Sequence, residues 1–270
     1  MSWLKELFHT EKPIIGLLHL KALPGDPFFF EKDKITDVIS QARADLHALQ
    51  DGGVDGILIT NEFSMPYEKN VSRVTVASMG TVIGAFLDEI TVPFGAEAIY
   101  DGDATIDICA ATGASFTRCL FTGAWAGDLG VVDRDIAVTL RHKHNLRLDD
   151  LKLFYFVTSE GEVFLNDRTT ADIAKTVIFN CHPDALVVGG SAAGQNPGAE
   201  VIKAIQSVSG TTPVVCGTGC KKENVKDILA AGNGAFVGTT FKKDGVFENP
   251  VDRKRVSEFM RIVKEFRKGE

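Results

Sequence analysis

Eight short apolar runs alternate along this chain with longer segments of helical spacing, and this alternation constrains the fold more than any other feature. The runs are rich in β-branched and aromatic residues, which favours strands, and each is followed by a stretch long enough for a covering helix. The predicted strands span residues 14–20, 56–61, 93–99, 115–121, 152–158, 185–189, 213–217 and 235–239. The predicted helices span residues 34–50, 71–90, 104–111, 135–144, 170–180, 199–207, 222–231 and 251–267.

Strands that are apolar throughout are buried on both faces, as in parallel α/β folds. A doubly wound open sheet and a closed barrel both fit, and we favour the (β/α)8 TIM barrel because eight units and a terminal helix agree with it. The 270 residues suit one such barrel without a dividing linker, so we expect a single domain over residues 1–270. Residues 2–8 form an expected extra N-terminal helix, capped by Ser2, that could close the lower end of the barrel.

Composition restricts the function classes. The formal net charge is -7, and the basic residues are scattered among carboxylates, so we expect no nucleic-acid partner. No apolar run approaches the roughly 20 residues that span a bilayer, and the first residues lack a secretory pattern, so we expect a cytoplasmic protein without a membrane partner. The five cysteines suit reduced thiols, and only Cys216 and Cys220 lie close, with no second pair that would complete a zinc site.

Two glycine turns, at residues 217–219 and 238–240, follow the last two predicted strands. Backbone N–H groups in such turns can approach an oxyanion, and the loops after strands seven and eight are the usual phosphate site of these barrels. The candidate phosphate-binding residues are Gly189, Gly190, Ser191, Gly217, Thr218, Gly219, Gly238, Thr239 and Thr240, with charge available from Lys221, Lys222, Lys242 or Lys243. The alternative is that the turns serve packing only. The absence of a Walker sequence argues against a nucleoside triphosphatase.

Polar residues at the carboxyl ends of the predicted strands are the candidates for chemistry. The catalytic candidates are Glu62, Asp101, His19 and Arg118. Glu62 is the preferred general base, with helix capping as its alternative, and His19 is either an acid–base group or a hydrogen-bonded core residue. Asp101 suits chemistry or a Mg²⁺ ion better than Glu97, because an ionised Glu97 among apolar neighbours needs a partner such as Arg118.

Four further residues are candidate substrate ligands, namely Lys21, Asn61, Glu97 and Asp128. Asn61 and Glu62 are adjacent, so only one of them should face the barrel mouth. Glu97 either pairs with Arg118 for structural reasons or binds substrate. Asp128 lies in the segment 122–130, which, like the segment 21–30, is expected to be a loop that acts as a lid or substrate wall. The aromatic residues 28–30 could equally form a contact between copies in a homo-oligomer. Mg²⁺ is the candidate cofactor, and the sequence predicts no set of metal ligands.

Several longer segments together resemble the BtpA family, and most closely its SgcQ-like branch, over essentially the whole chain. They are residues 15–20, 23–27, 53–56, 61–62, 111–118, 121–124, 179–185 and 240–247. The resemblance implies a barrel of the ribulose-phosphate-binding type. It also implies roles as different as photosystem I biogenesis and, for SgcQ-like proteins, nucleoside triphosphate hydrolysis beside sugar phosphotransfer genes. The chain departs from the family pattern at Glu97, where asparagine is common, and at Leu120, where a polar residue is common.

We therefore expect a cytosolic enzyme that acts on a small phosphorylated sugar-like metabolite by isomerisation, epimerisation or C–C cleavage with acid–base chemistry. Glu62 or Asp101 would be the base, and His19 or Arg118 would polarise a carbonyl group. Two alternatives remain open. The first is a non-catalytic assembly or regulatory protein that retained the barrel, and the second is a nucleoside triphosphatase.

Overall fold

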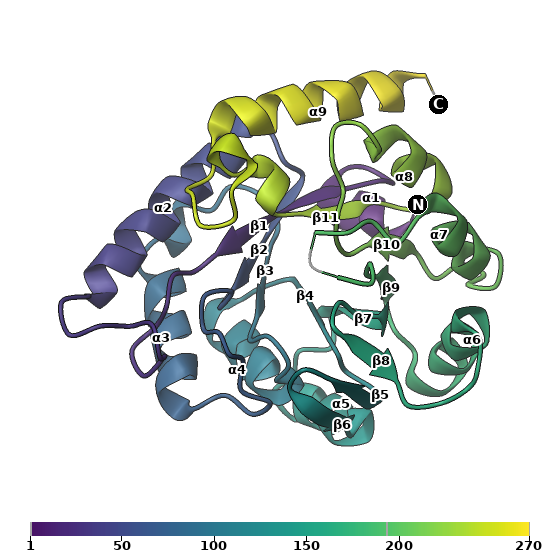
Figure 1. Ribbon diagram of the computed structural model, residues 1–270, viewed down its shortest axis with the longest axis horizontal. Coiled ribbons are helices and arrows are strands. Elements are labelled where there is room, and N and C mark those ends of the chain that lie inside the picture. Colours follow the sequence, from purple (N-terminus) through teal and green to yellow (C-terminus); the bar gives the residue numbers. More distant parts are fainter. Residues whose placement is uncertain (1, 193, 270) are drawn as a thin grey trace.

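The computed structural model describes residues 2–192 and 194–269, and eight parallel strands in it close into a barrel (Figure 1). The strands follow one another around the barrel in the order β1 (Ile14–His19), β11 (Ala235–Val237), β10 (Val214–Cys216), β9 (Ala185–Val188), β7 (Lys152–Thr158), β4 (Phe116–Cys119), β3 (Phe94–Glu97) and β2 (Gly56–Thr60), and β2 pairs again with β1. All eight predicted strands are present. The predicted TIM barrel is therefore confirmed.

Helices cover the outside of the barrel in Figure 1. They are α2 (Ile35–Gly52), α3 (Arg73–Gly84), α4 (Gly102–Thr112), α5 (Ile136–Asn145), α6 (Thr170–Cys181), α7 (Ala199–Gln206), α8 (Val225–Ala231) and α9 (Arg253–Lys268). The predicted helix 71–90 was too long, because α3 ends at Gly84 and a separate 3₁₀ turn, Leu87–Glu89, follows it. None of the helices among residues 2–192 and 194–269 is long and apolar enough to cross a membrane.

Alternation along the strands divides the core into two layers. In β1, Ile14 and Leu18 pack outward against the helices, whereas Ile15 and Leu17 belong to the cluster inside the barrel. His19 continues the inward series at the end of the strand. The same alternation turns the last inward residues of β3 and β4 toward the barrel axis, which prepares the site described below.

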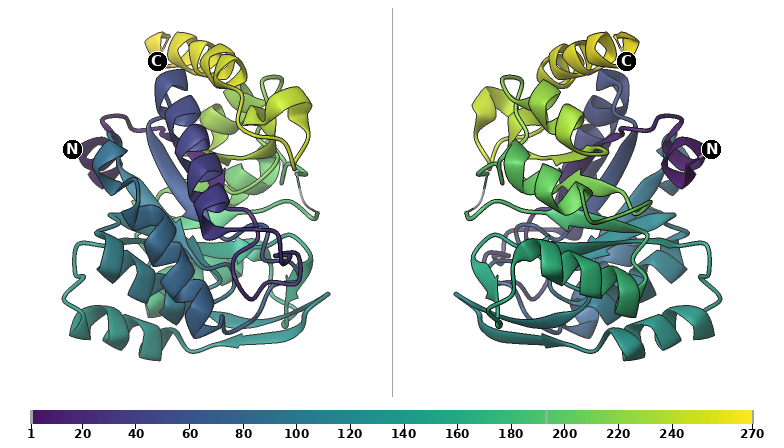
Figure 2. Two further views of the ribbon diagram at one scale, coloured as in Figure 1. Left: turned by 90° about the vertical axis from the view of Figure 1, so that its left-hand side faces the viewer. Right: turned by 90° about the vertical axis from the view of Figure 1, so that its right-hand side faces the viewer.

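The short helix α1 (Trp3–Phe8) closes the amino-terminal end of the barrel. The Ser2 hydroxyl accepts a hydrogen bond from the Lys5 N–H, so Ser2 is its N-cap, and Leu4 and Phe8 join the interior cluster. The rings of Phe8 and Phe116 lie 5.2 Å apart in an edge contact. Figure 2 shows α1 at one end of the barrel and the segment after β11 at the other. The predicted extra helix is confirmed, and the open mouth lies opposite it.

Residues 122–130, expected to be a loop, instead begin a small antiparallel sheet. Its strands are β5 (Gly123–Gly127), β6 (Gly130–Arg134) and β8 (Glu162–Phe164), in the order β6-β5-β8. Trp125 is buried, its ring centroid lies 4.5 Å from that of Phe164, and its Nε1 donates to the Thr122 carbonyl over 2.9 Å. The expectation of a loop was wrong here, because the segment pairs as β-strands and the Trp125 side chain anchors it in a small core of its own.

Candidate active site

A cavity of about 700 Å³ lies at the carboxyl ends of the barrel strands and collects most of the predicted site. It is lined by three of the four catalytic candidates, namely His19, Glu62 and Arg118. It is also lined by six of the nine phosphate-binding candidates, namely Gly217, Thr218, Gly219, Gly238, Thr239 and Thr240. Segments from distant parts of the sequence therefore meet around one space.

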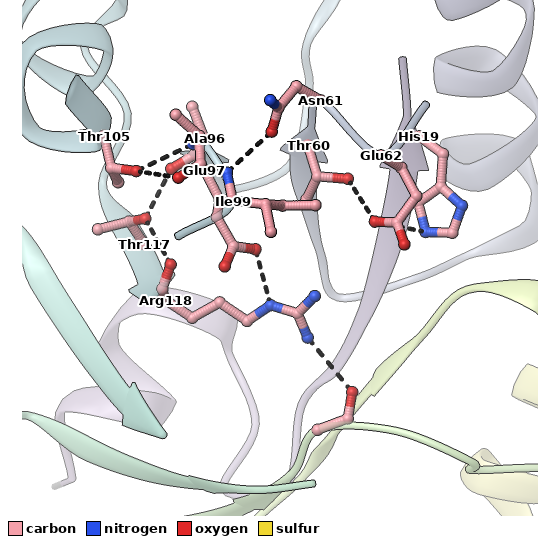
Figure 3. A network of polar contacts seen from close by, with 12 residues as sticks. His19, Thr60, Asn61, Glu62, Ala96, Glu97, Ile99, Thr105, Thr117 and Arg118 are labelled. Atoms are coloured by element: carbon pink, nitrogen blue, oxygen red, sulfur yellow. Dashed lines mark hydrogen bonds and ion pairs between the residues drawn. The ribbon is translucent and has the colours of Figure 1, made fainter. Parts of the chain in front are cut away.

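Arg118 lies on the floor of this cavity and is held by Glu97 (Figure 3). Its Nε donates to Oε2 of Glu97 over 2.9 Å, and its Nη1 donates to the Gly217 carbonyl over 3.2 Å. The guanidinium carbon lies 4.7 Å from the ring centroid of Phe236. Both charged residues are buried, and burial raises the pKa of Glu97 to about 6 although Arg118 lowers it. Glu97 is thus a positioning residue that fixes a cation beneath the cavity.

His19 is only 4% exposed, and neither of its ring nitrogens has a hydrogen-bond partner among the described residues. Its Nε2 lies 3.8 Å from Oε2 of Glu62, which is beyond hydrogen-bond range. Burial lowers the pKa of His19 to about 4, so the imidazole is neutral at pH 7. A neutral imidazole on the cavity wall offers one donor and one acceptor to a bound molecule.

Glu62 faces the mouth, while the neighbouring Asn61 does not, as the alternation of side chains requires. The Thr60 hydroxyl donates to Oε2 of Glu62 over 3.2 Å, and Tyr67 donates to the Glu62 carbonyl over 2.9 Å. The side-chain oxygen of Asn61 accepts the N–H of Ile99 over 2.8 Å, which ties β2 to the end of β3 (Figure 3). The structure therefore places Glu62 on the cavity and gives Asn61 a structural contact.

The two glycine turns meet side by side, and we call residues 217–219 and 238–240 the paired turns. The Thr240 hydroxyl donates to the Cys220 carbonyl over 2.8 Å and joins one turn to the segment after the other. The Gly217 N–H is used by the sheet, since it donates to the Val188 carbonyl. Within the described residues, four N–H groups of the paired turns donate to no protein acceptor, and they belong to Gly219, Gly238, Thr239 and Thr240, whereas the Thr218 backbone hydrogen-bonds the Cys216 thiol.

The third predicted turn does not join the cavity. The Gly189 N–H donates to the Thr158 carbonyl over 3.1 Å, and the Gly190 N–H donates to the Thr218 hydroxyl over 2.9 Å. Ser191 is exposed and its hydroxyl donates to the Gln195 side chain. None of these three residues lines the cavity, and the N–H groups of Gly189 and Gly190 and the Ser191 hydroxyl are engaged within the protein, so the structure does not place them as phosphate ligands.

Three more candidates lie away from the cavity. Asp101 caps α4, with Oδ1 accepting the Ala104 N–H over 3.1 Å and Oδ2 accepting the Val71 N–H over 2.8 Å, so both carboxylate oxygens are occupied. Lys21 lines a separate, smaller cavity, and Asp128 is exposed at the turn between β5 and β6. Among the described residues no group of three His, Cys, Asp or Glu side chains is placed to hold a metal, so the structure assigns no Mg²⁺ site.

The cavity is also lined by Glu160, Phe247 and Arg255, which were not predicted as site residues from the sequence. Glu160 lies two residues after the end of β7, so a search for polar residues at strand ends could have found it. The ring of Phe247 lies 5.5 Å from that of His19, and Nε of Arg255 donates to the Thr240 carbonyl over 3.0 Å. Arg255 lies on α9, and no pattern in the sequence marked it as a residue of the cavity. Of the four lysines considered for phosphate, Lys221 and Lys222 line the cavity, whereas Lys242 is buried in an ion pair with Asp45.

Comparison with known protein families identifies the family of this chain. The BtpA family model matches residues 10–265. The chain belongs to the BtpA family. The sgc region protein SgcQ of Escherichia coli is 44% identical over 268 residues, which cover 99% of this chain and 100% of that protein. The photosystem I biogenesis protein BtpA of Synechocystis is 27% identical over 96% of this chain and 91% of its own length.

Solved structures share the fold of this BtpA-family chain at low sequence identity. One described as a native KDPGal structure covers 99% of this chain and 100% of its own, with a TM-score of 0.58 and 17% identity. Phosphoribosyl anthranilate isomerase from Thermus thermophilus covers 94% of this chain and 98% of its own, with a TM-score of 0.55 and 8% identity. These likenesses support the barrel and carry no information about the substrate.

Proposed function

We propose that this protein is an enzyme for a small phosphorylated sugar-like metabolite, with the phosphate bound by the paired turns. The observation that carries the proposal is the group of four unengaged N–H donors, whose residues line the same cavity as His19, Glu62 and Arg118. Convergent backbone N–H groups bind oxyanions, and Lys221, Lys222 and Arg255 line the cavity on the same side.

The remaining residues suit proton transfer next to a carbonyl group. The carboxylate of Glu62 accepts a proton from the carbon beside the carbonyl, and the electron pair moves onto the carbonyl oxygen to give an enediolate. Arg118 and the neutral His19 donate hydrogen bonds to that oxygen as negative charge develops. Delivery of a proton to the neighbouring carbon gives an isomer, and delivery to the opposite face of the same carbon gives an epimer. In C–C cleavage Glu62 would instead take the proton of the β-hydroxyl group, which becomes a carbonyl as the Cα–Cβ bond breaks and its electron pair forms the enediolate.

A non-catalytic role is the second candidate, because one relative is named for photosystem I biogenesis. An assembly protein has no need for a buried cation, a buried imidazole and a carboxylate around one cavity. Each such buried polar group costs stability unless it is paired. The polar lining of the cavity therefore favours the enzyme.

Thermal shift and calorimetry with inorganic phosphate, D-ribulose 5-phosphate, D-fructose 6-phosphate and ATP test the proposal. Ligands that bind only the folded protein raise its melting temperature. We expect stabilisation by the sugar phosphates, whereas stabilisation by ATP alone would favour a triphosphatase and no stabilisation would favour the assembly role.

A matched pair of variants locates the binding site. Thr239 lines the cavity and contributes one of the four free N–H groups. Thr239→Asp places a negative charge among the donors and is expected to weaken phosphate binding by at least tenfold, because like charges repel at short range. Thr239→Asn has nearly the same shape without the charge and is expected to bind within about threefold of the wild type. Equal affinity of the two variants would place the anion elsewhere.

A further inference from the structure

We propose that Glu160 is a second acid–base residue, which acts on the opposite face of the substrate from Glu62, so that the reaction inverts a stereocentre beside the carbonyl. This inference rests on the proposed function and selects epimerisation among its three reaction types. Glu160 lines the cavity and has no role in the mechanism given above.

The order of strands sets the two carboxyls on either side of the phosphate. The paired turns follow β10 and β11, which are neighbours in the barrel. Two steps around the barrel from β11, past β1, lies β2, which carries Glu62 at its end. Two steps the other way from β10, past β9, lies β7, which Glu160 follows. A molecule that extends from the paired turns across the mouth therefore has one carboxyl on each flank.

Arg118 lies between these flanks. It comes from β4, which is next to β7, and its guanidinium reaches the Gly217 carbonyl in the first of the paired turns. A planar enediolate with its oxygen on this cation presents one face to Glu62 and the other to Glu160. A site with a single base returns the proton to the face it left, whereas two carboxyls on opposite faces allow inversion.

The electrostatic surroundings of Glu160 fit a proton donor. The pKa of Glu160 is raised to about 7, mainly by burial; Glu62 and Glu162 also raise it, whereas Arg118 and the Gly194 N–H lower it. Both the acid and the carboxylate are populated at neutral pH, which suits general acid–base catalysis. His19 lies on β1, across the barrel from β7. Its imidazole is neutral at pH 7, so it places no positive charge in the cavity beside that of Arg118.

The two proton transfers of this step balance. The Glu62 carboxylate takes the proton from carbon, the electron pair moves to the carbonyl oxygen, and the Glu160 carboxylic acid delivers its proton to the opposite face as the electron pair returns. No bond between heavy atoms is broken and nothing is oxidised or reduced. The enzyme ends with the proton on Glu62 instead of Glu160, and the reverse reaction starts from that form.

Deuterium exchange distinguishes this mechanism. D-ribulose 5-phosphate and D-fructose 6-phosphate are first tested for binding by thermal shift, and both are then incubated with enzyme in D₂O and followed by NMR. We expect deuterium at the carbon beside the carbonyl together with conversion to the epimer. Glu160→Gln should lower epimer formation by at least about 100-fold while Glu62 still exchanges the proton of one epimer. Glu62→Gln should likewise lower epimer formation, while Glu160 still exchanges the proton of the other epimer.

The exposed Glu200→Gln on α7 serves as the control, with wild-type rates expected, and circular dichroism shows whether each variant is folded. If neither sugar phosphate binds, the proposed function fails and this inference fails with it. If one binds but shows no exchange, or if Glu160→Gln forms the epimer at the wild-type rate, the phosphate site stands and the role of Glu160 is refuted.

Discussion

Gly238 lies directly against the imidazole of His19, so that a Cβ at position 238 would lie 2.9 Å from Cε1 and 3.0 Å from Nε2 of the ring. Gly238, which provides a free N–H in the second of the paired turns, therefore also leaves space for the imidazole of His19, because it has no Cβ. The glycine is required by the close approach of a side chain, whereas Gly219 has a φ of +69° and lies against the backbone of Gln195 and Asn196. Packing and proposed binding use the same turns.

Gly238→Ala is expected to lower the free energy of unfolding by about 1–3 kcal/mol, because the added methyl group overpacks against His19. Chemical denaturation measures this loss. Gly80→Ala in α3 is the control, because its Cβ would meet nothing within 4 Å, and it should stabilise by about 0.5–1 kcal/mol. Equal effects of the two substitutions would contradict the contact.

Glu97→Gln is expected to destabilise the protein by about 3–5 kcal/mol, since it leaves the buried Arg118 without its counter-ion. The loss should be accompanied by weaker binding of sugar phosphates, because the guanidinium is no longer fixed. Glu200→Gln removes an exposed ion pair with Lys203 and should change stability by less than about 1 kcal/mol. A Glu97 variant as stable as the Glu200 variant would show that the buried pair is not required.

Asp101→Ala is expected to cost about 1–2 kcal/mol, because α4 loses its N-cap and the Val71 N–H loses its acceptor. Its affinity for phosphate should equal that of the wild type. Asp101→Asn retains one acceptor oxygen and should lie between the two in stability. Phosphate binding that disappears while the fold remains would return Asp101 to the site.

Glu160→Gln is expected to make the protein more stable than the wild type at pH 8 but not at pH 4.5. The folded-state pKa of Glu160 lies above its ordinary value of 4.5, so the folded protein binds a proton that the unfolded chain lacks between pH 4.5 and about 7. That stabilising proton is fully present below pH 4.5 and is lost as the pH rises through 7. Denaturation curves at the two pH values measure the difference, and a pH-independent difference would contradict the raised pKa of Glu160.

The sequence predicted the barrel because each unit repeats the same local signals. Every unit pairs an apolar strand with a segment of helical length, and the two late glycine turns agree with a barrel. Strand alternation predicted that only one of Asn61 and Glu62 faces the mouth. The sheet of β5, β6 and β8 was not predicted, because β8 is three residues long and pairs with β5 across more than thirty residues of chain. Pairing over that separation leaves no local pattern.

Part of the candidate site was predicted, because the alternation of side chains along a strand is a local pattern. His19, Glu62 and Arg118 end inward-facing series on their strands, and that series is visible in the sequence. Asp101 has the same type of position, but backbone N–H groups of α4 and of the segment before α3 engage its oxygens. Whether a strand-end carboxylate lines a cavity or caps a helix depends on such neighbours, and they are set by tertiary structure.

A crystal structure of the protein grown with D-ribulose 5-phosphate would show whether the paired turns bind the phosphate group. We expect phosphate density within hydrogen-bond distance of the N–H groups of Gly219 and Thr239, with the sugar extending over Arg118 between Glu62 and Glu160. Density for the phosphate elsewhere on the molecule, or paired turns whose N–H groups point away from a shared anion, would contradict it.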